Sequence, residues 1–438
     1  MNRYENLQLN YINGVWRPGA SEKSITDYNP YTGEKLLVFQ AATVADMNEA
    51  YEGAAEKQKV WAQTNPYQIS GIMHKAAQIM QDRSEEIIDW LIKESGSTRI
   101  KAQVELNASI GIVAHSANYP FLMETKIAPS VIPDKVNYII RKPVGVVGVI
   151  SPFNFPMLLT VRSVAGALAA GNGVVLKPSS STPVTGGTLV AKIFEEAGVP
   201  AGVLSVIVPK TSEIGDAFYE HPIPDVISFT GSTNVGVRIG EVAGRNVKKT
   251  MLELGGNNAI VVLDDADVDY AVQACSCGRF FHSGQICMSA NRIIVDESIF
   301  AEFAEKYVAL VKTLKVGDPS LPDTLVGPLI TEDEAVRVVD WAEKARAEGA
   351  QILLEGKREN SVVYPYVIKG TNETWTAKNE VFGPVVTLIC AKDESDALRI
   401  ANDTDAGLSG AIHTSSKERG FQFAKHWKTG MVHINDQS

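Results

Sequence analysis

Short apolar runs bounded by turn residues recur along this chain and alternate with longer segments of helical periodicity. Gly173–Lys177, Val226–Phe229 and Asn258–Leu263 are such runs, and their continuous apolar character is typical of strands buried on both faces. Apolar residues at helical spacing mark residues 44–63, 66–94, 184–197 and 235–243. Because a strand buried on both faces needs helices on either side of its sheet, the alternation predicts an α/β fold.

The length and charge of the chain narrow the range of functions. With 438 residues it should form at least two domains. The net charge is −10, from 41 basic and 51 acidic residues, and no basic stripe is present, so no nucleic-acid partner is expected. No apolar run reaches the roughly 18 residues of a membrane span, and residues 1–14 lack the apolar core of a signal peptide. Four cysteines in this length favour a reducing, cytoplasmic setting.

Cys287 is the candidate nucleophile of the chain. It follows Ser283-Gly284-Gln285-Ile286, in which the glycine permits a tight turn. A free cysteine is more often a small buried apolar residue, and it becomes a nucleophile only when a partner lowers its pKa or takes its proton. Glu253, 34 residues earlier in a Glu-Leu-Gly-Gly run, is the candidate base.

A second pair of cysteines has a simpler interpretation. Cys275 and Cys277 form a Cys-x-Cys pair, but no second pair completes a metal site. We interpret both as small core residues on a helix and expect no bound metal.

The segment around Gly231 is a candidate phosphate contact. A strand should end at Phe229, Gly231 should make the turn, and Ser232 should cap the helix that follows. The N–H groups at that helix start would face a pyrophosphate, and Gly236 would allow close approach. The segment lacks the Gly-x-Gly-x-x-Gly pattern of standard dinucleotide folds, and a capped helix after a strand is common.

Three further polar residues have both a functional and a structural interpretation. Lys177 ends a buried strand and either points into a ligand crevice or extends to solvent. Asn154, between two prolines, is either a turn residue or the amide donor that a developing oxyanion requires. Glu380 precedes Phe-Gly-Pro and could simply begin a helix.

Together these motifs resemble the aldehyde dehydrogenase superfamily, and the resemblance covers essentially the whole chain. It rests on Glu-Leu-Gly-Gly at 253–256, Gly-Gln-Ile-Cys at 284–287, Phe-Thr-Gly-Ser at 229–232, Pro-Phe-Asn-Phe-Pro at 152–156 and Asn-Glu-Val-Phe-Gly-Pro at 379–384. Two positions depart from the family pattern. Phe153 replaces a tryptophan and Asn379 replaces an acid.

The resemblance implies a reaction. Cys287 would attack an aldehyde, Asn154 and the N–H of Cys287 would stabilise the oxyanion, and Glu253 would activate the water that hydrolyses the thioester. The implied cofactor is NAD. Its implied contacts are Phe153, Lys177, Ser180, Gly231, Ser232, Val235, Gly236, Leu254, Glu380 and Phe382. Relatives restricted to NAD often carry a glutamate where this chain has Ser180, which leaves NADP open as a second cofactor.

The implied substrate tunnel is apolar and partly aromatic, and its wall would suit a flat ring. Its residues would be Phe155, Leu159, Arg162, Phe281, Ile286 and Met288. Arg162 could meet a phenolic or other polar substituent. Residues 284–289 and 430–436 look most like the benzaldehyde and vanillin dehydrogenase branch. Succinate semialdehyde and aliphatic aldehydes remain alternatives, as does plain core packing of these side chains.

The resemblance also implies a fold of two open α/β sheet domains and a protruding oligomerisation hairpin. The cofactor-binding domain would comprise residues 1–122 and 143–252, the hairpin residues 123–142, and the catalytic domain residues 253–435. A homodimer or homotetramer is implied. Residues 436–438 would begin a C-terminal segment that the family continues beyond Ser438, and a chain that truly ended there should have impaired activity.

Two functions of other classes stay open at this point. One is a cysteine hydrolase that uses Cys287 with a histidine such as His282, which would leave Lys177, Gly231 and Glu380 without roles. The other is a relative that binds the cofactor without turnover.

Overall fold

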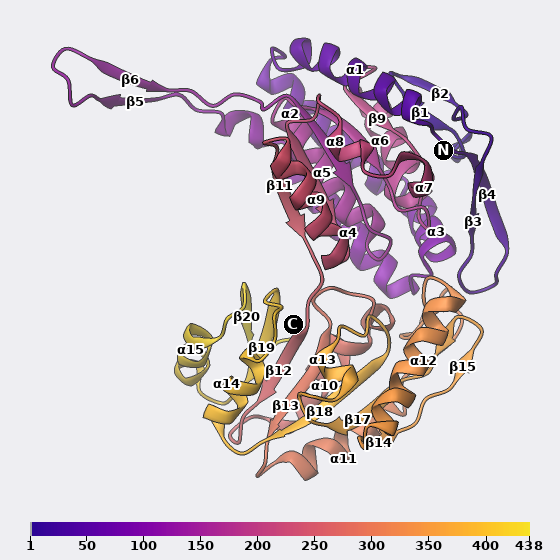
Figure 1. Ribbon diagram of the computed structural model, residues 1–438, viewed down its shortest axis with the longest axis vertical. Helices are drawn as coiled ribbons and strands as arrows, with labels where there is room; N and C mark the ends of the chain where they lie inside the picture. The colour runs from indigo at the N-terminus through magenta and orange to yellow at the C-terminus, as the bar shows by residue number, and fades with distance from the viewer. Residues whose placement is uncertain (1) are drawn as a thin grey trace. The chain divides into compact units, whose positions relative to one another are not determined.

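A computed structural model describes residues 2–438, which form two compact units. The first unit contains the residues up to Asn29, Gly33–Ser95 and Ala102–Glu253. The second unit contains Pro30–Thr32, Gly96–Lys101 and Leu254–Ser438. Each unit is built on its own seven-stranded sheet, and helices lie on both faces of each sheet (Figure 1). The predicted α/β fold is confirmed.

The sheet of the first unit has the strand order β11-β10-β7-β8-β9-β1-β2. Its strands are β1 (Asn10–Ile12), β2 (Val15–Arg17), β7 (Val146–Ile150), β8 (Gly173–Lys177), β9 (Leu204–Val206), β10 (Val226–Thr230) and β11 (Lys249–Glu253). The strands from β7 to β11 are parallel, while β1 pairs antiparallel with β9 and β2. The chain order along the sheet reverses between β7 and β10.

The predicted helical segments of the first unit are helical with two differences, and the unit has further helices that were not predicted. They are α1 (Val44–Trp61), α2 (Pro66–Asp82), α3 (Ser84–Ser95), α4 (Arg99–Ser116), α5 (Pro156–Ala169), α6 (Leu189–Ala197), α7 (Thr211–Ile214), α8 (Ala217–Glu220) and α9 (Thr233–Arg245). The expected helix over 66–94 is two helices, because Arg83 leaves the helical conformation and its guanidinium binds the carbonyl of Asn2 and the carboxylate of Glu86. The expected helix over 184–197 opens with a π turn, Val184–Thr188, that contains a Gly-Gly pair.

A β-hairpin extends from the first unit (Figure 1). Its strands, β5 (Lys126–Pro129) and β6 (Val136–Ile139), pair antiparallel, with Ile127 opposite Tyr138. A second hairpin in this unit, β3 (Ser24–Tyr28) with β4 (Lys35–Gln40), pairs in the same way.

The sheet of the second unit has the order β14-β17-β18-β13-β12-β19-β20. Its strands are β12 (Asn258–Val262), β13 (Ala290–Asp296), β14 (Gln351–Leu354), β17 (Tyr366–Gly370), β18 (Val385–Ala391), β19 (Ser409–His413) and β20 (Met431–Ile434). Only β14 runs antiparallel to its neighbour in this sheet. A short pair, β15 (Arg358–Glu359) and β16 (Val362–Val363), lies outside the sheet.

Helices cover both faces of the second sheet, so a central strand such as β12 is buried on both sides. They are α10 (Val268–Phe280), α11 (Phe300–Val311), α12 (Glu332–Ala347), α13 (Trp375–Lys378), α14 (Glu394–Asn402) and α15 (Lys417–His426). On β12, Ile260 and Val262 pack with α10 and α11, while Ala259 and Val261 pack with α14 and α15. This alternation explains why the strand reads as a continuous apolar run.

None of the helices within residues 2–438 is both long enough and apolar enough to cross a membrane.

Candidate active site

The carboxyl ends of four parallel strands gather the motifs of the first unit at one edge of its sheet. Lys177 closes β8 and Glu253 closes β11, while the segments holding Asn154 and Gly231 follow β7 and β10. Backbone hydrogen bonds tie these strand ends together, from the N–H of Ser151 to the carbonyl of Lys177 (3.2 Å) and from Gly231 to Glu253 (3.0 Å). The reversal between β7 and β10 falls within this edge, and open α/β sheets bind ligands at such a point.

Asn154 is buried just before α5, at a helix start that a distant side chain caps. Phe155 occupies the N-cap position but makes no side-chain capping bond. Instead Oε1 of Glu105, a fully buried residue of α4, accepts the N–H groups of Met157 (2.9 Å) and Leu158 (3.2 Å). A carboxylate at a helix N-terminus is stabilised by the helix dipole. Glu105 therefore fixes the helix start that adjoins the Asn154 segment.

The residues expected to contact a dinucleotide lie around β8, β10 and α9. Burial lowers the pKa of Lys177 to about 8, while Ser180, three residues on, is exposed. Ser232 has the extended backbone of an N-cap, but its hydroxyl makes no capping bond, so the expected side-chain cap is wrong. The first N–H groups of α9 are consequently not covered by that hydroxyl. Val235 is exposed, Gly236 is buried and Phe153 is half-buried.

Glu253 is the last residue of the edge strand β11, and its side chain is exposed. Its backbone is fixed by parallel pairing with Thr230 of β10. Leu254, half-buried, begins the second unit.

Cys287 lies in a strained segment between α10 and β13, on the amino side of the second sheet. His282 (φ 49°), Ser283 (φ 56°) and Gly284 (φ 73°) are three successive residues in the left-handed region, which costs energy for the first two. Buried side-chain bonds hold this segment. The Ser283 hydroxyl donates to the carbonyl of Gly327 (2.9 Å), and the Gln285 amide accepts from Ile330 N–H (2.9 Å). Cys287 itself is half-buried, as expected of an accessible nucleophile.

Glu380 lies in the second unit, beside the glycine pair that precedes β12. Its Oε1 accepts the N–H of Gly256 at 3.1 Å. Burial raises the pKa of Glu380 to about 7, against the opposing effects of the Gly256 N–H and the nearby Arg279. The buried Arg279 also donates to the carbonyl of Gly383, next to Phe382, which has φ 52°. Arg279 thus holds the turn that follows Phe382 and lies close enough to Glu380 to affect its pKa.

The expected substrate residues divide between the two units. In the first unit Phe155 and Leu159 are half-buried and Arg162 is exposed. Leu159 and Arg162 lie in α5, four and seven residues after Phe155, the N-cap of that helix. In the second unit Phe281, Ile286 and Met288 are all half-buried and flank Cys287 along the chain.

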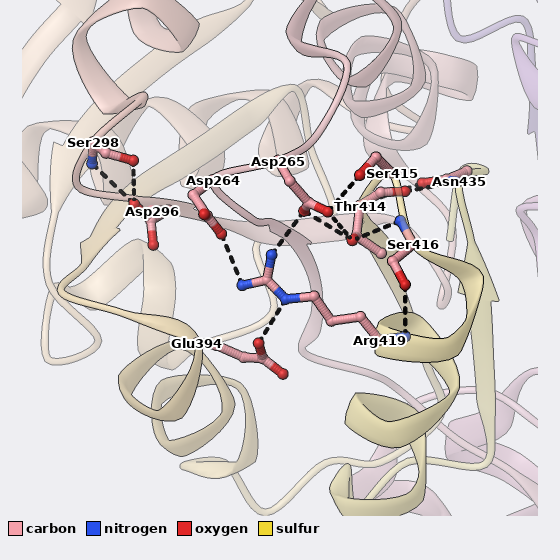
Figure 2. A network of polar contacts seen from close by, with 10 residues as sticks. All are labelled: Asp264, Asp265, Asp296, Ser298, Glu394, Thr414, Ser415, Ser416, Arg419 and Asn435. Atoms are coloured by element: carbon pink, nitrogen blue, oxygen red, sulfur yellow. Dashed lines mark hydrogen bonds and ion pairs between the residues drawn. The ribbon is translucent and has the colours of Figure 1, made fainter.

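The opposite, carboxyl edge of the second sheet is occupied by a closed ion-pair network (Figure 2). Arg419 donates to Asp264 (2.7 Å), Asp265 (2.9 Å) and Glu394 (2.7 Å), and Asp265 also accepts from the hydroxyl of Thr414. Asp264 and Asp265 follow β12 and Thr414 follows β19, whereas Glu394 begins α14 and Arg419 lies in α15. The network therefore fastens both helices to the sheet. The motif residues of this unit, Cys287 and Glu380, instead lie at the amino ends of its strands, before β13 and β18.

The family comparison decides the class of protein. Residues 16–438 match the aldehyde dehydrogenase family. The chain belongs to that family. It is 49% identical to benzaldehyde dehydrogenase YfmT of Bacillus subtilis, over 100% of this chain and 90% of the relative. It is 48% identical to a vanillin dehydrogenase of Corynebacterium glutamicum, over 97% of this chain and 88% of the relative. The crystal structure of an NAD-dependent benzaldehyde dehydrogenase from Corynebacterium glutamicum matches with a TM-score of 0.96 at 46% identity, covering 100% of this chain and 96% of that one.

Membership of the aldehyde dehydrogenase family confirms the resemblance drawn from the motifs and disfavours the cysteine hydrolase. One expectation about the other cysteines is wrong in part. Cys275 is buried in the core of α10, but Cys277 is exposed because it lies on the opposite side of the same helix.

Several supporting residues of this aldehyde dehydrogenase were not singled out in the sequence. Glu105, Gln285 and Asn258 each hold a segment that carries a motif residue, through partners distant in the chain. The sequence contains only a weak indication of these supporting roles. Glu105 shares the buried helical face of Ala102, Leu106 and Ser109, where an acid needs a partner, but spacing alone does not say which.

Proposed function

We propose that this aldehyde dehydrogenase oxidises aromatic aldehydes of the benzaldehyde and vanillin type to carboxylic acids, with NAD as the principal hydride acceptor. The observation that carries the proposal is the gathering of Asn154, Lys177, Gly231 and Glu253 at one edge of the first sheet, in a chain that keeps Cys287 in its strained turn. The identity of 46–49% to proteins named benzaldehyde dehydrogenase supports the choice of substrate.

The residues of the first unit fit a dinucleotide. The start of α9 offers N–H groups that Ser232 does not cap, and a helix N-terminus favours an anion such as a pyrophosphate. Lys177, half-buried at the end of β8, supplies a donor next to the strand reversal. When bound, NAD supplies the ring that accepts a hydride. Ser180 is exposed and uncharged, so it does not repel the extra phosphate of NADP, and we infer a lower but measurable NADP activity.

The chemical steps are assigned to three residues. The Cys287 thiolate attacks the aldehyde carbon, a C–S bond forms, and the carbonyl oxygen takes up the electron pair as an oxyanion. The Asn154 amide and the N–H of Cys287 donate to that oxyanion. Loss of hydride from the same carbon leaves a thioester. Glu253 then takes a proton from water, whose oxygen attacks the thioester carbon, and the C–S bond breaks to release the acid and the thiolate.

Arg162 is assigned to the polar end of the substrate. Of residues 2–438, none forms a hydrogen bond or ion pair with its exposed guanidinium. Long helical side chains lean toward the helix N-terminus, which directs Arg162 back along the face of Phe155 and Leu159. A guanidinium there would bind a phenolic oxygen. Arg162→Leu should reduce kcat/KM for vanillin about tenfold more than for benzaldehyde. Equal losses for the two aldehydes would contradict this role.

An activity screen tests the proposal as a whole. Purified protein would be assayed at 340 nm with benzaldehyde, vanillin, succinate semialdehyde and hexanal, each with NAD and with NADP. The proposal predicts the highest kcat/KM for an aromatic aldehyde with NAD. A preference for succinate semialdehyde would refute the substrate assignment but keep the mechanism. Cofactor binding without turnover of any aldehyde would favour a non-catalytic relative.

We further propose a homo-oligomer assembled through the β5–β6 hairpin. Its strands expose apolar side chains that a monomer would leave in water, including Ile127 (67% exposed), Tyr138 (65%) and Ile139 (55%). Clustered exposed apolar residues commonly mark a protein interface. None of the four cysteines among residues 2–438 forms a disulfide, which supports a reducing compartment, and we place the enzyme in the cytoplasm.

A further inference from the structure

Asn258 makes a direct bond to the backbone of Cys287. It is the first residue of β12, and its side chain is 4% exposed. Its Nδ2 donates to the carbonyl of Cys287 at 2.6 Å and lies 3.4 Å from the carbonyl of Ser289, while its Oδ1 accepts the N–H of Ser409 at 2.9 Å. One amide therefore joins the nucleophile's segment to the starts of two parallel strands.

The segment's own backbone hydrogen bonds, from Gln285 N–H to the His282 carbonyl (3.1 Å) and from Ser289 N–H to the Ile286 carbonyl (2.9 Å), do not involve the carbonyl of Cys287. Cys287 and Ser289 precede β13, so their carbonyls lie outside its strand pairs, and the β12–β13 register shifts directly after Asn258. The carbonyl of Cys287 belongs to the peptide bond with Met288. Holding that carbonyl fixes one of the two peptide planes that meet at the Cα of Cys287, and so restricts the direction of the Cα–Cβ bond that carries the sulfur.

We propose that Asn258 is a positioning residue for the nucleophile, which aims the Cys287 thiolate by fixing the carbonyl of the same residue. The inference rests on the proposed function in that Cys287 must be the nucleophile. Nucleophilic attack is sensitive to placement, and an error of about 1 Å can cost roughly a hundredfold in rate. Loss of the Asn258 donor should therefore lower the rate of acylation more than it changes the KM for aldehyde.

Two substitutions separate positioning from general damage. Asn258→Ala removes all three contacts of the amide, to Cys287, Ser289 and Ser409, at every pH. Asn258→Asp is nearly isosteric, and its protonated acid can still donate to Cys287 and accept from Ser409. Facing carbonyl oxygens in a buried site, that carboxyl should have a raised pKa, and its ionised form would present only acceptors to the Cys287 carbonyl. In the Asp variant, the hydrogen bond to the Cys287 carbonyl should therefore form at low pH and be lost as the pH rises.

Asn10 offers a matched control in the first unit. It is fully buried, and its amide donates to the carbonyl of Gln40 (3.1 Å) and accepts the N–H of Val208 (2.7 Å). Asn10→Asp therefore places a carboxyl in the same bonding pattern without contact with the Cys287 segment. It should lower thermal stability as the pH rises, but it should leave the pH profile of the chemistry unchanged.

The measurement is the rate of the NADH burst with benzaldehyde, together with the rate of alkylation of Cys287 by iodoacetamide, from about pH 6 to pH 9. Each variant is expressed as a ratio to wild type, so that the effects of groups common to all the enzymes cancel, namely Glu380 with its raised pKa of about 7 and the buried, charged Arg279. For Asn258→Ala we expect both rates to be 10- to 100-fold below those of wild type, with a ratio that does not change with pH. We expect a ratio that falls with rising pH for Asn258→Asp, and a flat ratio near one for Asn10→Asp.

The outcomes that overturn the proposal are distinct from those that overturn the proposed function. Ratios within twofold of one for both Asn258 variants, or the same falling profile for Asn10→Asp, would reject a positioning role. If Asn258→Ala does not fold, the isosteric Asp variant alone decides. A Cys287→Ser enzyme that retained the burst would instead reject the nucleophile assignment itself.

Discussion

Replacement of Gly256 by alanine should displace the nucleophile without touching its side chain. A Cβ at Gly256 would lie 2.4 Å from the carbonyl oxygen of Cys287, which is backbone and cannot rotate away. An ordinary carbon–oxygen contact begins at about 3.3 Å, so the two segments must separate by about 0.9 Å. A shift of that size is expected to cost roughly a hundredfold in the rate of attack, or about 2.7 kcal/mol in the barrier.

Stopped-flow measurement of the first NADH burst with benzaldehyde would report this loss directly. Gly111→Ala, on the exposed side of α4, is the matched control because no atom lies within 4 Å of its added Cβ. That control should be neutral, or stabilise the fold by about 0.5–1 kcal/mol. A Gly256→Ala enzyme whose burst stayed within threefold of wild type would refute the reasoning, since the steric conflict could not then reach the sulfur.

Three further predictions follow from the cofactor residues and the hairpin. Ser180→Glu should suppress the NADP reaction selectively, and equal loss with NAD would mean that Ser180 is not beside the adenosine ribose. Because burial raises the pKa of Glu380 to about 7, above its unfolded value near 4.5, its ionisation removes stability as the pH rises between these values. Glu380→Gln should therefore raise the unfolding temperature at pH 8 but not at pH 4.5, while it raises the KM for NAD at pH 8. Threonines at Ile127 and Tyr138 should reduce oligomer mass in light scattering, and an unchanged mass would exclude the hairpin as the interface.

The strands were predictable where the physical signal was local. Gly173–Lys177 is β8 residue for residue, because burial on both faces demands an uninterrupted apolar run with turn residues at its ends. The helix boundary at Arg83 was missed because it depends on bonds to Asn2 and Glu86. The side-chain cap expected at Ser232 is absent for a related reason. A residue can have the backbone conformation of an N-cap while its side chain makes no capping hydrogen bond.

The sequence motifs name candidates for the chemistry, whose roles stay predictions, but they do not name the residues that hold those candidates in place. Cys287 and Glu253 stand in motifs that resemble those of the aldehyde dehydrogenases, and the resemblance implies a nucleophile and a base. Asn258 and Glu105 act through partners 29 and 52 residues away, and nothing in their neighbourhoods names those partners. Long-range hydrogen bonds depend on the packed fold, which short-range patterns do not determine.

The most direct test of the mechanism is the pre-steady-state time course of Glu253→Gln with benzaldehyde and NAD. The glutamine keeps the size of the side chain and removes the base. We predict an NADH burst of about one equivalent per subunit at nearly the wild-type rate, followed by a steady state slowed by roughly 10²- to 10⁴-fold, because deacylation alone needs the base. Cys287→Ala should abolish both phases. A glutamine variant with the full steady-state rate would contradict the assignment of Glu253 and the account built on it.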